Sequence, residues 1–196
     1  MAFQYDLTII GAGIVGLATA LKMTETHPGT KLLVIDKESQ VAQHQTGHNS
    51  GVIHSGLYYR PGSVKAATCV TGRKALLEFC DRNGVPYEIC GKIVVATSQD
   101  EVPRLEELHR RGVANGLQGV DVLGPERLKE FEPHATGVKA LHVPETGIID
   151  YKKVAEAYAA KALAFAVAFH DDLVAILEKT TLFTGRQFDR LGAAPA

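Results

Sequence analysis

Apolar residues open the chain in two short runs separated by a helical pattern. The first run covers residues 7–10 and the second covers residues 32–35, and each is long enough for one buried strand. Between them, apolar residues recur at helical spacing from Val15 to Leu21, and a polar turn containing Pro28 and Gly29 follows. The pattern predicts a strand, a helix and a second strand, the repeating unit of α/β folds.

The rest of the chain alternates between helical and strand patterns. The charged and apolar positions predict a helix that ends at Asn83 and Gly84, and a strand segment interrupted at Cys90 and Gly91. In order, we expect a helix over 61–83, strand over 85–97, a helix over 100–116, a strand over 120–123, a helix from Pro125, strands over 138–143 and 147–149, and a helix from Tyr151 to about residue 179.

Three glycines and an acidic residue occur in the opening unit at fixed spacing. Gly11, Gly13 and Gly16 form a G-x-G-x-x-G motif between the first strand and the helix. Such glycines allow a tight turn, close approach of the backbone to a pyrophosphate and close helix packing, while the helix N-terminus attracts phosphate. Asp36 lies twenty positions after Gly16, where a carboxylate accepts hydrogen bonds from ribose hydroxyls. The motif predicts a dinucleotide site that disfavours NADP because Asp36 would repel a 2′-phosphate, although Lys37 weakens this repulsion.

A polar, glycine-rich segment over residues 38–62 follows directly, and it is too long for a simple connection. It starts at the carboxyl edge of the predicted sheet, where open α/β folds bind their ligands, so we expect it to carry function. His48, Asn49 and Ser50 offer donors and acceptors, and Gly51 allows the backbone to pass close to a ligand.

Composition and charge narrow the class of protein. The 196 residues suffice for one sizeable domain or two small ones, and 45% hydrophobic residues is ordinary for a soluble protein. A net charge of −1 creates no field that would recruit nucleic acid, so we expect no nucleic-acid partner. Three cysteines without a C-x-x-C pair favour reduced thiols and a cytoplasmic location. We find no signal peptide and no apolar stretch long enough to span a bilayer, so any membrane contact is expected to be peripheral, at the inner face of the cell membrane.

Taken together, the motifs are similar to those of a known family. The segments GAGIVGLATA, VIDKE and TGHNSGVIHSGLYYRPGSVKA resemble FAD-dependent oxidoreductases of the D-amino-acid oxidase superfamily, and within it the L-2-hydroxyglutarate oxidases and dehydrogenases. The later segments GVPYEICGKIVVAT, VLGPERLKEFEP and ETGIIDY fit the same group, so the resemblance covers about residues 5–158.

The resemblance implies FAD as the cofactor and an α/β fold in which a Rossmann-like FAD-binding domain is interrupted by a substrate-domain sheet and is C-terminally truncated. Residues 1–84 would form the N-terminal part of the FAD-binding domain, residues 85–150 part of the substrate domain, and residues 151–196 a helix and a divergent tail. We expect neither a third parallel strand nor a second glycine-rich flavin contact in this tail, so the chain is interpreted as a fragment. A sheet of only two strands would expose apolar surface and favour self-association.

The implied reaction oxidises a small 2-hydroxy acid, L-2-hydroxyglutarate, to 2-oxoglutarate. The hydride on C2 passes to flavin N5, and the electrons leave to oxygen or a quinone. A base must take the hydroxyl proton, and the motif makes His54 the candidate, while the alternative is a structural hydrogen-bonding role. Tyr59, Arg60 and Lys92 are candidates for binding the dicarboxylate, and the alternatives are a packed tyrosine and surface ion pairs.

His44, His48 and His54 lie close together in sequence, which raises the question of a metal site. An intervening glycine and the lack of a cysteine or acidic partner argue against one, so we expect no bound metal.

Three other functions stay open. The chain could be a non-catalytic remnant that binds part of FAD, because the third strand and the second flavin contact are expected to be missing. It could carry another activity of the superfamily, such as oxidation of an amino acid or of glycerol 3-phosphate. An NAD dehydrogenase is the weakest alternative, because the glycine-rich segment after Asp36 suits a flavin better.

Overall fold

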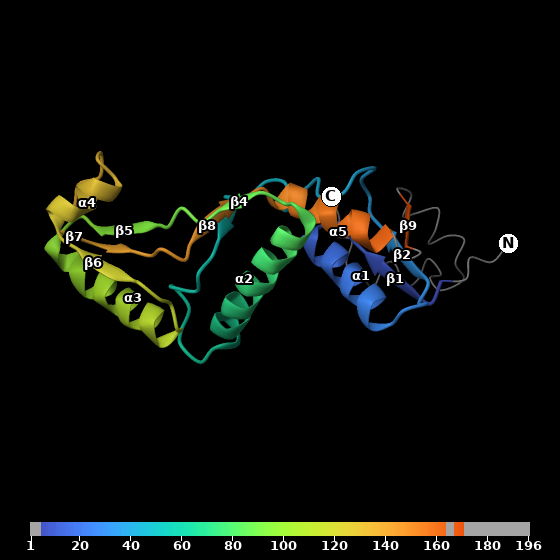
Figure 1. Cartoon of the computed structure of the whole chain (residues 1–196), viewed down its shortest axis with the longest axis horizontal. Helices are drawn as coiled ribbons and strands as arrows, with labels where there is room; N and C mark the ends of the chain where they lie inside the picture. Colours follow the sequence, from blue (N-terminus) through green and yellow to red (C-terminus); the bar gives the residue numbers. More distant parts are fainter. Residues whose placement is uncertain (1–4, 164–166, 171–196) are drawn as a thin grey trace, which may run out of the picture. The chain divides into compact units, whose positions relative to one another are not determined.

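The computed structural model describes residues 5–163 and 167–170, and the chain divides into two compact units (Figure 1). Residues 1–49 and 151–196 form the first unit, and residues 50–150 form the second. The boundary expected after residue 150 therefore coincides with a boundary between units. Residue 84, after which another boundary is expected, falls within the second unit, and an ion pair between Arg73 and Glu145 joins the preceding helix to a later part of the same unit.

A parallel sheet with two helices beside it makes up the first unit. Strands β1 (Leu7–Ile10), β2 (Leu32–Ile35) and β9 (Val167–His170) lie in the order β1-β2-β9. Helices α1 (Ile14–Thr26) and α5 (Tyr151–Leu163) pack side by side, and α1 also contacts β1 and β2 (Figure 1). The strand, helix and strand predicted for the opening residues are confirmed.

The expectation for the tail is wrong at β9. A third parallel strand is present, and it pairs with β2 so that Leu32 lies opposite Val167 and Ile35 opposite His170. The alanine-rich sequence favours a helix locally, but pairing with a strand whose four residues are all buried overrides this weak local preference. From β9 to β1, the strands are the third, second and first parallel strands along the chain. The same order, 3-2-1, occurs in the classic doubly wound sheet. Residues 164–166 and 171–179 of the expected helix lie outside the described residues.

Strand β1 forms the edge of this sheet among the described strands, and it exposes apolar side chains. Leu7 is 37% exposed and Ile10 is 64% exposed, and Val15 at the start of α1 is 78% exposed. The expected exposed apolar surface is therefore present, although the sheet has three strands and not two.

The second unit contains two small antiparallel sheets, in the orders β3-β8-β4 and β5-β7-β6, and three α-helices. The strand segment expected over 85–97 is split at Cys90 and Gly91, as predicted, and its two halves join different sheets. Gly91 has a φ of +74°, and a Cβ there would lie 2.9 Å from Nε2 of His142. The elements are β3 (Val52–Ile53), α2 (Val64–Asn83), β4 (Tyr87–Glu88), β5 (Ile93–Ala96), the 3₁₀ helix Gln99–Glu101, α3 (Val102–Ala114), β6 (Asp121–Leu123), α4 (Pro125–Phe131), β7 (Lys139–His142) and β8 (Gly147–Ile149).

Local chemistry explains where α2 begins and ends. The hydroxyl of Ser63 accepts a hydrogen bond from the backbone N–H of Ala66, so the helix starts at Val64, three residues later than expected. Gly84 adopts the left-handed conformation with a φ of 66°, and its N–H donates to Cys80 O. The predicted end at Asn83 and Gly84 is therefore confirmed.

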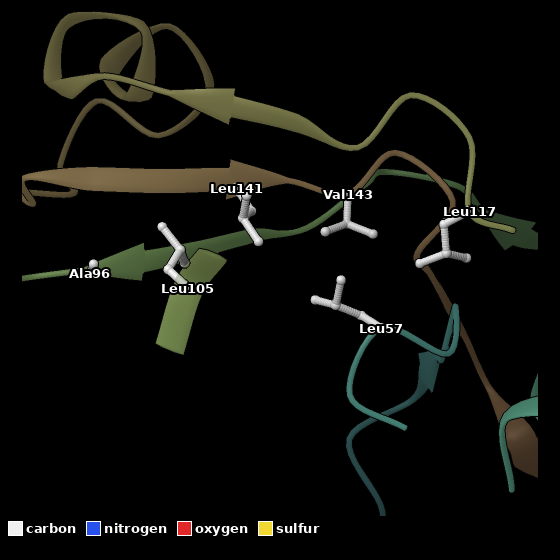
Figure 2. Packing of buried hydrophobic residues seen from close by; sticks show 6 residues of the cluster. All are labelled: Leu57, Ala96, Leu105, Leu117, Leu141 and Val143. Carbon is white, nitrogen blue, oxygen red and sulfur yellow. The ribbon is translucent and has the colours of Figure 1, made fainter. Parts of the chain in front are cut away.

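One apolar core joins α3 to the sheet that contains β5 and β7. It includes a residue from the polar loop after β3, Leu57, whose side chain is only 1% exposed. Figure 2 shows this side chain directed from its loop toward Val143. The six buried members of the cluster are Leu57, Ala96, Leu105, Leu117, Leu141 and Val143.

The ion pair between Arg73 and Glu145 is largely buried, with side chains 11% and 21% exposed. We expect Arg73→Met to lower the free energy of unfolding by about 2 kcal/mol, because the Glu145 carboxylate would lose its cation in a place that water hardly reaches. Arg82→Met is the matched control, since Arg82 and Glu78 are 73% and 71% exposed, and it should cost less than about 0.5 kcal/mol. Urea unfolding measures both changes, and equal effects would contradict this assignment.

Candidate functional site

The G-x-G-x-x-G turn has the backbone geometry that its sequence predicts. Gly11 has a φ of +106°, which favours glycine, and its N–H donates to Ile35 O at 2.7 Å. A Cβ on Gly16 would lie 1.9 Å from Gly11 O, so α1 packs against the turn at a distance that only glycine permits. Gly13 is the N-cap of α1 and provides no side-chain cap, and the first turn carries no acidic residue. The positive end of the helix dipole is therefore not neutralised by an acid of its own first turn.

Asp36 fastens the end of β2 to this turn. Its Oδ2 accepts from the N–H of Ala12 at 2.6 Å, and its Oδ1 accepts from the N–H of Glu38 at 3.0 Å. A carboxylate has about four acceptor positions, so it can still accept hydrogen bonds from ribose hydroxyls. Lys37 forms an exposed ion pair with Glu38, in which Nζ lies 3.1 Å from Oε1.

The loop after β2 folds back onto the glycine turn through residues that the sequence analysis did not single out. The hydroxyl of Thr46 accepts from the N–H of Ile14 at 3.0 Å, and Ala42 N donates to Ala12 O at 3.1 Å. Ala42 has a φ of +62°, a conformation that non-glycine residues rarely adopt. Thr46 is neutral, so it satisfies one helix N–H without cancelling the attraction of the helix end for an anion. The sequence signal for this contact was limited to the presence of a threonine in the polar loop after the G-x-G-x-x-G motif.

The other candidates in this loop mostly shape its backbone. His48 Nδ1 lies 2.9 Å from His44 O, and Asn49 Nδ2 donates to Thr46 O at 2.7 Å. Gly51 has a φ of +67°, and a Cβ there would lie 2.8 Å from Ile149 O. The side chains of His48, Asn49 and Ser50 are exposed.

These observations fit the ADP half of a dinucleotide. The close contact at Gly16, the side-chain-free N-cap at Gly13 and the carboxylate of Asp36 occur together in one unit. A pyrophosphate is attracted to a helix N-terminus whose first turn holds no acidic residue, and ribose hydroxyls need an acceptor such as the Asp36 carboxylate, so the unit offers a feature for each.

Asp36→Ala should weaken both the fold and the cofactor site. We expect the free energy of unfolding to fall by about 2 kcal/mol, because two partly buried N–H groups lose their acceptor, and the Kd for FAD to rise about tenfold. Unfolding and FAD titration of the same variant measure the two effects. Glu25→Ala is the acidic control, since the pair that Glu25 makes with Lys22 is exposed, and a similar loss there would contradict this role for Asp36.

His54 is an exposed residue within a largely buried segment. Ile53, Ser55 and Leu57 are 1%, 2% and 1% exposed, whereas His54 is exposed to solvent. Cys69 Sγ donates to His54 O at 3.3 Å, and burial raises the pKa of the Cys69 thiol, which keeps this donor protonated. The loop is therefore anchored on both sides of His54 while the imidazole faces solvent.

The substrate candidates lie on this loop and beside it. The ammonium of Lys92 lies 4.3 Å from the ring centre of Tyr58, a cation–π contact that sequence reasoning did not foresee. Tyr59 is half-buried and Arg60 is exposed. Within residues 5–163, neither Lys92 nor Arg60 forms a recorded ion pair with a carboxylate, so the alternative of a surface ion pair receives no support there.

The profile of the DAO family, described as FAD dependent oxidoreductase, matches residues 6–189 of this sequence. The chain belongs to this family. FAD is accordingly the cofactor of its family, and the members are oxidoreductases. The match extends past residue 158, farther than the motifs alone indicated.

Curated relatives narrow the similarity within the family. The chain is 54% identical over 158 residues to an L-2-hydroxyglutarate dehydrogenase of Indibacter alkaliphilus, covering 81% of this chain and 40% of that protein. It is 48% identical over 168 residues to a mitochondrial L-2-hydroxyglutarate dehydrogenase of Pongo abelii, covering 86% of this chain and 38% of that protein. The chain therefore spans about two fifths of the length of these relatives.

Solved structures support the same fold. An FAD-bound L-α-glycerophosphate oxidase from Mycoplasma pneumoniae matches with a TM-score of 0.80 and 28% identity, over 86% of this chain and 45% of that one. A glycine oxidase from Geobacillus kaustophilus matches with a TM-score of 0.74 and 18% identity, over 87% of this chain and 47% of that one, which supports the fold alone. The predicted Rossmann-like FAD fold is confirmed.

Across the part of the chain with described structure, we find no helix of the length and apolar character that a membrane crossing requires.

Proposed function

We propose that this chain is part of an enzyme that oxidises L-2-hydroxyglutarate to 2-oxoglutarate with FAD as the first electron acceptor. The observation that carries the proposal is the 54% identity to an L-2-hydroxyglutarate dehydrogenase across 81% of this chain. The anchored loop with an exposed His54 supplies a site for proton transfer that such a reaction requires.

The proposed cofactor residues begin with the glycine turn of the first unit. Gly11, Gly13 and Gly16 would let the backbone approach the pyrophosphate, and Asp36 would accept hydrogen bonds from the ribose. Lys37, His48, Asn49, Ser50 and Gly51 complete the proposed cofactor segment.

In the proposed mechanism, FAD held by the residues above would supply a two-electron acceptor for the hydride on C2 of the substrate. The imidazole of His54 accepts the proton of the 2-hydroxyl group as the carbonyl forms. Arg60 and Lys92 hold the substrate carboxylates by charge-assisted hydrogen bonds, and Tyr59 lines their site. Oxygen or a quinone is the proposed final electron acceptor.

Anaerobic mixing of the FAD-loaded protein with L-2-hydroxyglutarate tests this function. We expect the flavin absorption to bleach and 2-oxoglutarate to form, while the D-enantiomer leaves the flavin oxidised. A loaded protein whose flavin stays oxidised with L-2-hydroxyglutarate would contradict the proposal.

Oxidation of glycerol 3-phosphate is a second candidate, supported by the similarity to the L-α-glycerophosphate oxidase. Both substrates carry a hydroxyl group that loses a hydride and an anionic group that a cation can bind. Bleaching by glycerol 3-phosphate and not by L-2-hydroxyglutarate would favour this second function. Binding of FAD with no reduction by either compound, or by amino acids, would favour a non-catalytic remnant.

The proposed location is the cytoplasm, because Cys69, Cys80 and Cys90 are all free thiols. The exposed apolar side chains of Leu7, Ile10 and Val15 support self-association or a peripheral membrane contact. Gel filtration at several protein concentrations, with and without lipid vesicles, tests both contacts.

A further inference from the structure

The turn that follows His54 is tied to the C-terminal end of α3. Asn115 lies at the C-terminal end of this helix, and its Nδ2 donates to Gly56 O at 2.9 Å and to Tyr59 O at 2.9 Å. Both partners are carbonyl oxygens, so only the NH₂ end of the amide can face them, and both of its hydrogens are used. Tyr59 N also donates to Gly56 O at 3.3 Å. Asn115 therefore ties together the two ends of a tight turn.

Gly112 and Arg111, near the C-terminal end of α3, contact the same segment. Leu57 is 1% exposed, and its Cδ1 lies 2.9 Å from the position that a Cβ on Gly112 would occupy. Arg111 Nη1 donates to Tyr58 O at 3.4 Å. The end of α3 thus holds the turn by one apolar contact and three side-chain hydrogen bonds, two of which come from Asn115.

The remaining anchors near His54 are weaker or act on one neighbour only. The thiol of Cys69, which bonds His54 O at 3.3 Å, is a weak donor, and the hydroxyl of Thr146 bonds only the side chain of Ser55, at 3.2 Å. Gly56 has a φ of +103° and follows Ser55 directly, so it is a flexible pivot once its carbonyl is released. Before His54 the backbone is fixed by the pairing of Ile53 with Gly147, and after it the backbone depends on the amide of Asn115.

We propose that Asn115 is a positioning residue for His54, acting by fixing the turn from Gly56 to Tyr59. The inference rests on the proposed role of His54 and adds to it a residue 61 positions away in sequence. Asn115 acts through the turn and is not assigned a contact with substrate or cofactor. A misplacement of a reacting group by about 1 Å lowers a rate by about a hundredfold, which sets the expected size of the effect.

Asn115→Ala removes both side-chain hydrogen bonds to the turn without straining the backbone. Asn115 has a φ of −84°, which alanine adopts readily, and the left-handed position is taken by Gly116 with a φ of +82°. We expect amide exchange at Tyr59 to accelerate about tenfold in hydrogen–deuterium exchange, while amides within α2 stay unchanged. Asn115→Asp has the same size but donates no hydrogen bond, so it should give the same result and decides the test if the alanine variant does not fold.

Asn83→Ala is the matched control, because Asn83 also lies at a helix end and donates to a single carbonyl, Phe79 O, at 2.8 Å. It should leave exchange at Tyr59 unchanged. In a wild-type protein that reduces its flavin with L-2-hydroxyglutarate, Asn115→Ala should lower kcat about a hundredfold with KM and FAD content unchanged. Unchanged exchange at Tyr59 in both variants, or an unchanged kcat, would overturn the proposal. If the wild type shows no flavin reduction, the proposed function fails, while the exchange result still decides whether Asn115 holds the turn.

Discussion

His54→Ala should lower the rate of flavin reduction by L-2-hydroxyglutarate about a thousandfold and leave the melting temperature unchanged. The rate falls because no group remains to take the hydroxyl proton, and general base catalysis contributes factors of about 10² to 10⁴. Stability is expected to stay constant because the His54 side chain is exposed, whereas its neighbours Ile53 and Ser55 provide the buried contacts. Stopped-flow absorption of the flavin and thermal unfolding measure the two quantities.

Two further variants separate a base from other roles. His54→Gln keeps hydrogen bonding but cannot take a proton at neutral pH, so it should be about as slow as the alanine variant. A rate restored by glutamine would show that His54 orients the substrate instead. His134→Ala, which removes another exposed histidine of the same unit, should keep the wild-type rate, and a comparable loss there would contradict a specific role for His54.

Gly16→Ala should abolish FAD binding and lower the free energy of unfolding by about 4 kcal/mol or more. The new Cβ would lie 1.9 Å from Gly11 O, and a backbone oxygen cannot move aside as a flexible side chain can. Either α1 moves away from β1 or the turn opens, and each change disrupts the site for the pyrophosphate. Overpacking in a well-packed site usually costs about 1–3 kcal/mol, and a contact this short exceeds the usual case.

Gly72→Ala is the control for this substitution, because Gly72 is also a helical glycine but has nothing within 4 Å of the added Cβ. It should raise the free energy of unfolding by about 0.5–1 kcal/mol, since alanine favours a helix more than glycine does. Urea unfolding and FAD titration of both variants give the comparison. If Gly16→Ala binds FAD like the wild type, the packing assigned to the glycine turn is incorrect.

Local sequence was sufficient to predict the turns and helix ends that depend on one particular residue type. The glycine turn, the end of α2 at Gly84 and the start of α4 at Pro125 each depend on a backbone conformation or a missing N–H that one residue type supplies. Their positions could therefore be predicted from the residues alone.

Elements and contacts that depend on distant partners could not be predicted in this way. Strand β9 lies in an alanine-rich stretch that continues a helical pattern, and its pairing with β2 was not visible in the local sequence. Thr46 and Asn115 are single polar residues without a motif, and their roles depend on what folding brings beside them, Ile14 in one case and Gly56 in the other. The sequence identified the loop that carries His54 but not the helix that holds it.

The most direct test of the central claim is the absorption spectrum of the purified chain during titration with FAD. We predict a bound flavin whose spectrum is shifted and structured relative to free FAD, with saturation at one FAD per chain, and loss of this binding in Gly16→Ala. A folded chain that stays colourless and takes up no FAD at any concentration would contradict the proposal that the glycine turn and Asp36 bind this cofactor.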